Sequence, residues 1–121
     1  MPKVLLYITA KIIWNFLFYN TDFHENRAHV HVGKRNTEKL CKIWLEPNVE
    51  LAKQGDLSDS QIREIMEIAY NYREKLISQW KLFKQGKITE IRIAYVIASI
   101  IISYLVTSAF ITLIERIHNI F

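Results

Sequence analysis

The chain is poor in cysteine, which cross-links small secreted proteins, and in glycine and proline, which interrupt regular structure. Its 121 residues include one cysteine (Cys41), three glycines and two prolines. A single cysteine excludes an intramolecular disulfide, and no apolar N-terminal segment has the pattern of a cleavable signal peptide. We therefore expect the folded part to reside in a reducing cytoplasm, with Cys41 as a small buried apolar side chain.

Several motifs of catalysis are also missing. The chain contains no Walker-type phosphate loop, no G-x-G-x-x-G, no paired CxxC motifs and no nucleophile elbow. Nucleotide-dependent mechanisms and hydrolase mechanisms based on such an elbow therefore have no support. We expect no cofactor and, at most, a metal-independent, ribonuclease-like enzymatic activity.

The composition that remains is that of one folded domain. Half of the residues are hydrophobic and 23% are charged, which is far from the composition of disordered chains. A chain of this length has room for one core and little else. The net charge of +4 favours polyanionic partners or an anionic membrane face.

The N-terminal half alternates apolar and polar residues and is rich in β-branched and aromatic side chains, a pattern typical of strands. The expected strands lie within residues 4–23 (one or two strands), 28–32, 40–45 and 49–52. Short connections between them predict an antiparallel sheet. The aromatic side chains of this half are expected to form core in preference to a base-stacking surface. They are Trp14, Phe16, Phe18, Tyr19 and Trp44.

A helix is predicted from Ser58 to Gly86. Ser58 and Gln61 have the spacing of a capping box, Leu57 can pack onto Ile62, and apolar residues then recur every three or four positions. One continuous helix of this length would approach 40 Å at about 1.5 Å per residue. The fold class is thus α+β, a small antiparallel sheet packed on one long amphipathic helix, over residues 1–92.

Residues 93–114 carry no charged side chain. A helix of that length covers roughly 33 Å, against about 30 Å of bilayer hydrocarbon, so this apolar C-terminal helix is predicted to span a membrane. Basic residues are more numerous before the span than after it. This asymmetry predicts a cytoplasmic domain anchored to the inner membrane, with residues 115–121 as a short tail. The alternative is an apolar helix buried in the protein or in an oligomer.

Ser99, Ser103 and Thr107 share one face of the predicted helix at four-residue spacing. Small residues in such a row let membrane helices approach closely. A homo-oligomer formed through the C-terminal helix is therefore one expected partnership.

His29 and His31 are the residues on which chemistry is predicted to depend. Two imidazoles at i and i+2 of a strand point the same way. As metal ligands they would need a third donor; His24 is the candidate if a metal is present, with Asp22 and Glu46 as alternatives.

In a metal-free ribonuclease, His29 and His31 would act as catalytic base and acid. Arg27, Lys34 and Arg35 would then hold the RNA phosphate. A third interpretation gives the pair no chemistry, since both histidines can line a half-exposed sheet face and form hydrogen bonds or stack there.

The order of several motifs resembles the bacterial family called domain of unknown function 4160. The residues that carry the resemblance are Met1-Pro2-Lys3-Val4, Phe16 to Tyr19 before Asn20-Thr21-Asp22, His29-Val30-His31-Val32, Trp44-Leu45-Glu46-Pro47 with Val49 to Ala52, Leu57-Ser58, Ile62 to Ile65 and Trp80. The resemblance implies a small α+β domain associated with toxin–antitoxin pairs, and the apolar C-terminus lies outside the family pattern.

Three functions follow as hypotheses. The first is a toxin–antitoxin component that binds or cleaves RNA, or binds a cognate antitoxin or another small protein, through its H-x-H sheet face. The second is a non-catalytic, membrane-tethered adaptor. The third is a metal-binding domain.

Overall fold

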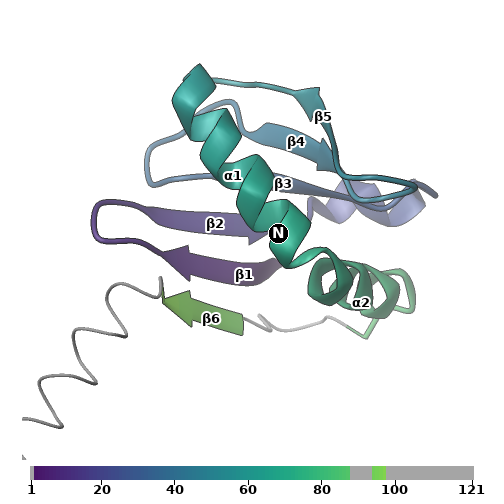
Figure 1. Cartoon of the computed structure of the whole chain (residues 1–121). Coiled ribbons are helices and arrows are strands. Elements are labelled where there is room, and N and C mark those ends of the chain that lie inside the picture. Colours follow the sequence, from purple (N-terminus) through teal and green to yellow (C-terminus); the bar gives the residue numbers. More distant parts are fainter. Residues whose placement is uncertain (1, 88–93, 98–121) are drawn as a thin grey trace, which may run out of the picture.

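The computed structural model describes residues 2–87 and 94–97. The described elements form an α+β fold (Figure 1). In chain order they are β1 (Lys3–Ile8), β2 (Ile13–Leu17), the 3-10 helix η1 (Asn20–His24), β3 (His29–Gly33), β4 (Cys41–Trp44), β5 (Glu50–Lys53), α1 (Asp59–Asn71), α2 (Arg73–Lys84) and β6 (Ala94–Ile97).

The sheet has the strand order β5-β4-β3-β2-β1-β6. Strands β1 to β5 pair antiparallel with their neighbours, which confirms the predicted antiparallel sheet. β6 pairs parallel with β1. A parallel pair needs a long crossover, and the segment that contains α1 and α2 precedes β6.

The core lies between the sheet and α1, which crosses one face of the sheet in Figure 1. Phe16 pairs with Val32, and Val30 pairs with Ile43, so these side chains share a face, and all four are buried. The core cluster extends to Ile65 of α1. Trp14, Phe16 and Phe18 are fully buried, which confirms that these aromatic residues form core. Cys41 is buried as expected, and burial raises the pKa of its thiol to about 12.

The N-terminus of α1 has the predicted capping box. The backbone N–H of Gln61 donates to Ser58 Oγ at 3.3 Å, and the backbone N–H of Ser58 donates to Gln61 Oε1 at 3.0 Å. Leu57 and Ile62 are both buried beside this turn, as the hydrophobic staple requires.

Replacing Ser58 with Ala should lower the free energy of unfolding by about 1 kcal/mol, because one N-terminal N–H of α1 loses its acceptor. Urea unfolding followed by circular dichroism measures the change. Ser78→Ala on the exposed surface of α2 is the matched control and should change stability by less than about 0.5 kcal/mol. Equal losses in the two variants would contradict the capping role.

The prediction of one long helix was wrong in one respect, because the helix is divided at Tyr72 into α1 and α2. Tyr72 has φ −109° and ψ 17°, and no Gly or Pro marks the break. Arg73 Nε donates to the carbonyl oxygen of Leu45 at 2.8 Å and so ties the break to the end of β4. Six strands spaced by about 4.8 Å span only about 24 Å, so a straight helix of about 40 Å would extend past the sheet. The bend keeps the apolar residues of α2 on the core.

The predicted C-terminal helix differs from the structure where the two can be compared. Residues Ala94–Ile97 form β6, not the start of a helix. The first residue of the predicted span (93), its remainder (98–114) and the tail (115–121) lie outside the described residues. Within the part of the chain that is described, none of the helices combines the length and the apolar character needed to cross a bilayer.

Candidate metal site

β3 places His29 and His31 on the face of the sheet opposite α1. Their cross-strand partners are Trp44 and Lys42 of β4, whereas Val30 and Val32, which alternate with them, point into the α1 core. The period of two in a strand explains this division. The face is not half-exposed as expected: His29 is 0% exposed and His31 is 7% exposed. Polar side chains this deeply buried need partners.

η1 covers this face and brings Asp22 to the histidines. The backbone N–H of Tyr19 donates to Asp22 Oδ2 at 2.7 Å, which fixes the carboxylate at the start of the 3-10 helix. The ring of Tyr19 stacks on that of His31, with centroids 3.9 Å apart and planes inclined by 26°. Asn20-Thr21-Asp22 supplies the turn residues that allow the chain to reverse over β3.

The three side chains converge on one point. Asp22 Oδ1 lies 3.1 Å from His29 Nε2, and Asp22 Oδ2 lies 3.0 Å from His31 Nε2. One donor atom from each of the three residues lies within 4.8 Å of the other two. Both distances are short enough for hydrogen bonds to the carboxylate, and among the described residues neither buried Nε2 atom has a hydrogen-bond partner other than Asp22.

A backbone contact of His29 determines which of its ring nitrogens carries a proton. Its Nδ1 lies 2.9 Å from the carbonyl oxygen of Arg27, which can only accept, so Nδ1 carries the proton. Nε2 faces the Asp22 carboxylate at 3.1 Å, so either a proton on Nε2 or a metal ion between the two atoms would make this buried contact attractive.

His31 is also in the form that binds metals. Burial lowers its pKa to about 4, an effect that the charge of the Asp22 carboxylate and a hydrogen bond with it oppose and that His29 and Lys42 reinforce. The imidazole is therefore neutral at pH 7. A neutral imidazole is the ligand form of histidine.

A pocket of about 430 Å³ opens over His31 and Asp22. Lys39, Lys42 and Lys53 contribute to its wall, and Lys42 Nζ lies 3.5 Å from Glu25 Oε2. None of these lysines was singled out from the sequence. Only Lys42 carried a usable signal, because it is in phase with Trp44 on the strand next to the histidines.

The other residues predicted for this site lie elsewhere. His24 is exposed at the end of η1, where it packs edge-on against Phe23, and it is outside the converging group. Glu46 contributes its backbone carbonyl, which accepts from Arg27 Nε at 2.7 Å. The Arg27 guanidinium also lies over the Trp44 ring, 4.2 Å from its centroid.

Lys34 and Arg35 follow the far end of β3, whereas Arg27 precedes its start. A five-residue strand separates these ends by about 16 Å, so the three cations do not gather around the histidines. The arrangement predicted for holding an RNA phosphate beside His29 and His31 is therefore not assembled from this set of residues.

Comparison with known proteins gives one match. No curated protein and no solved structure matches the chain. The model of the family described as "Domain of unknown function (DUF4160)" matches residues 14–81, more than half of the chain, including Asp22, both histidines and Trp80. The resemblance noted from the sequence is confirmed, and the chain belongs to this family.

Proposed function

We propose that this protein is a metal-binding domain that holds one divalent transition-metal ion between Asp22, His29 and His31. The observation that supports the proposal most directly is the convergence of two buried Nε2 atoms on one buried carboxylate, each about 3 Å from one of its oxygens and with no other hydrogen-bond partner among the described residues. A cation between these atoms would satisfy both nitrogens and neutralise the buried carboxylate.

The spacing of the donor atoms suits such an ion. Bonds from zinc to nitrogen or oxygen are about 2.0–2.2 Å at tetrahedral angles, so two donors on one ion lie about 3.3–3.6 Å apart. The two histidine–aspartate distances are close to that spacing. The donor atoms lie within 4.8 Å of one another, so the widest separation would close by up to about 1 Å on metal binding. The Arg27 carbonyl that orients His29 is the kind of outer partner that metal-binding histidines use.

The donor set also selects the class of metal. Two imidazoles and one carboxylate suit zinc, iron(II) and their first-row neighbours, whereas magnesium and calcium prefer oxygen ligands alone. Three protein donors leave at least one coordination position for water or a ligand. His31 and Asp22 also line the pocket described above, which lies beside that position.

A metal-free ribonuclease mechanism has less support than a metal site. General acid–base catalysis requires both imidazoles within hydrogen-bond reach of a substrate. His29 is fully buried and enclosed by Trp44, Trp80 and the backbone of Arg27. The toxin–antitoxin role and the membrane-tethered adaptor role stay predictions from the sequence.

Metal loading tests the proposal. Full-length protein stripped with a chelator, incubated with zinc and desalted should retain about one zinc per chain by elemental analysis. His31→Ala should weaken zinc affinity by more than about 100-fold, because loss of an outer partner alone costs about 10- to 100-fold. Magnesium should not be retained.

His24→Ala is the matched control, since it removes an exposed histidine two residues from Asp22 and should leave loading unchanged. Circular dichroism establishes that each variant is folded, and Asp22→Asn replaces any variant that is not. Equal zinc in the His24 and His31 variants, or no zinc in the native protein, would refute the site.

A further inference from the structure

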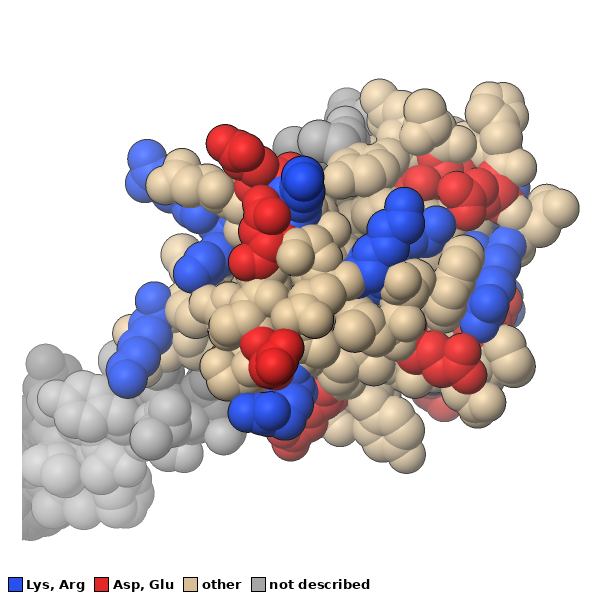
Figure 2. Space-filling view, turned by 90° about the horizontal axis from the view of Figure 1, so that it is seen from above, with Lys and Arg blue, Asp and Glu red and all other residues tan. Residues whose placement is uncertain are grey.

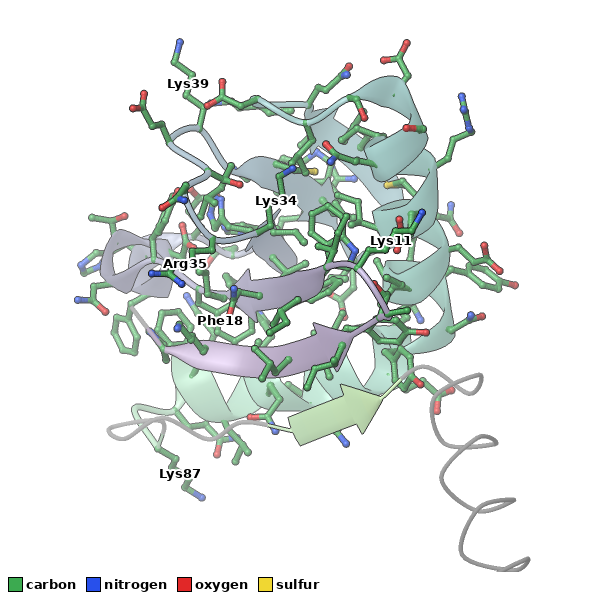
Figure 3. The ribbon with its side chains drawn as sticks, turned by 90° about the vertical axis from the view of Figure 1, so that its left-hand side faces the viewer. Lys11, Phe18, Lys34, Arg35, Lys39 and Lys87 are labelled. Atoms are coloured by element: carbon green, nitrogen blue, oxygen red, sulfur yellow. The ribbon has the colours of Figure 1, made fainter. Side chains whose placement is uncertain are left out.

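Two hairpin turns meet at one end of the sheet, away from the metal site. β2 lies beside β3, so the β1–β2 turn adjoins the β3–β4 turn. Between them is a pocket of about 310 Å³ lined by Lys11, Ile12, Ile13, Lys34 and Arg35. Figure 3 looks onto this end of the molecule, with Lys34 between Lys11 and Arg35.

The pocket is positively charged and contains no acidic side chain. Lys11, Lys34 and Arg35 are all exposed, and among the described residues none of them forms an ion pair with a carboxylate. By contrast, Arg27 and Lys42 are paired with Glu50 and Glu25. The face seen in Figure 2 mixes acidic and basic residues. Cations that line one pocket without a counter-charge repel each other, and a bound anion would relieve that repulsion.

Both turns are fixed by side-chain hydrogen bonds to the backbone. Thr9 Oγ1 accepts from the backbone N–H of Ile12 at 2.9 Å, and Thr37 Oγ1 accepts from that of Lys34 at 3.1 Å. Asn36 adopts a positive φ of 70°, a conformation that asparagine tolerates. Because the backbone is already ordered, a ligand at this pocket has to order little more than the cationic side chains.

We infer that this pocket binds phosphate groups of a nucleic-acid backbone. Arginine and lysine are the side chains that recognise phosphate, arginine through two parallel N–H donors and lysine as a point charge. Ile13, which is 51% exposed, adds apolar surface beside the cations for a sugar or base. Three cations around one concave pocket suit a single flexible strand, which can bend to reach them, better than they suit a flat lipid surface.

Two of these cations lie at a different place from the one predicted from the sequence. Lys34 and Arg35 were expected to work with Arg27 beside the histidines, and the fold joins them to Lys11 instead. The anion site lies at the opposite end of β3 from Arg27 and shares no lining residue with the proposed metal site. The two proposals can therefore fail separately.

The test is binding of a fluorescent 12-nucleotide oligouridine RNA to full-length protein, followed by anisotropy in 50 mM salt. The triple variant Lys11→Gln, Lys34→Gln and Arg35→Gln should bind at least tenfold more weakly. For single strands each neutralised phosphate contributes about −0.7 to the slope of log K against log salt. Loss of three contacts should thus flatten that slope by about 2.

The matched control removes three exposed cations from the helices, Arg63→Gln, Lys75→Gln and Lys81→Gln. It has the same net charge as the test variant and should keep most of the affinity. An equal loss in both triple variants would mean that overall charge, and not this pocket, binds the RNA. No RNA binding in 50 mM salt, or binding of phosphatidylglycerol vesicles without binding of RNA, would overturn the inference. A DNA oligonucleotide of matched length decides whether the sugar matters.

Discussion

Zinc should stabilise the native protein against unfolding by about 2.7 kcal/mol when its free concentration is 100 times its dissociation constant. For a domain of this size each kcal/mol raises the melting temperature by roughly 4–8 °C, so the expected shift exceeds 10 °C. The physical reason is that the unfolded chain scatters Asp22, His29 and His31, so the assembled site exists only in the folded state. Thermal unfolding with chelator and with zinc measures this difference.

Variants of Asp22 separate the carboxylate from its neighbours. Asp22→Ala should abolish the shift with zinc, because the bridging anion between the two Nε2 atoms is gone. Asp22→Asn keeps the oxygen that accepts from the Tyr19 backbone N–H but removes the charge, so its shift should be strongly reduced. His24→Ala should keep the full shift. A shift in Asp22→Ala as large as that in the native protein would place the zinc elsewhere.

Trp80→Ala should lower the free energy of unfolding by about 3–5 kcal/mol, the usual cost of removing a large aromatic side chain from a core. Trp80 is 5% exposed, and its ring lies 5.3 Å from Phe18, 5.7 Å from Phe83 and 4.9 Å from His29. The substitution would leave a cavity between α2, the start of β3 and Phe18, which follows β2. A domain stable by 5–15 kcal/mol would lose a large part of that margin.

Urea unfolding of Trp80→Ala and Trp80→Phe tests the prediction, with the Phe variant expected to lose less because it keeps part of the ring. Tyr70→Ala is the control: Tyr70 is an aromatic residue of α1 that is 72% exposed, and its loss should change stability by less than about 0.5 kcal/mol. Similar losses in Trp80→Ala and Tyr70→Ala would show that packing around Trp80 contributes little. Because Trp80 packs against His29, weaker zinc binding should accompany the lost stability.

Local patterns in the sequence predicted most of the elements correctly. The alternation around Val30 and Val32, the capping pair Ser58 and Gln61 and the positive-φ residue Gly86 each act within a few residues of the chain. Such signals depend on backbone geometry and nearest neighbours, so they predict an element without knowledge of the fold. The break at Tyr72 had no such signal, since the tie from Arg73 to the Leu45 carbonyl joins positions 28 residues apart.

The choice of the third donor also required the tertiary structure. Asp22, His24 and Glu46 were all candidates by residue type. In a 3-10 helix, residues two apart point about 120° away from each other, so η1 can aim Asp22 or His24 at β3, but not both. The Tyr19 backbone N–H and the stacked Tyr19 ring favour the orientation that buries Asp22.

The sequence by itself determined the α+β class, the strand phases, the start of the helix and the common face of His29 and His31, because these depend on periodicity and capping. Only the tertiary structure decided that Asp22 joins the histidines in a buried site and that Lys11 joins Lys34 and Arg35 at the far end of the sheet. Both decisions bring together residues from separate elements. Strand order and the path of η1 over the sheet, which no local pattern encodes, fix which side chains meet.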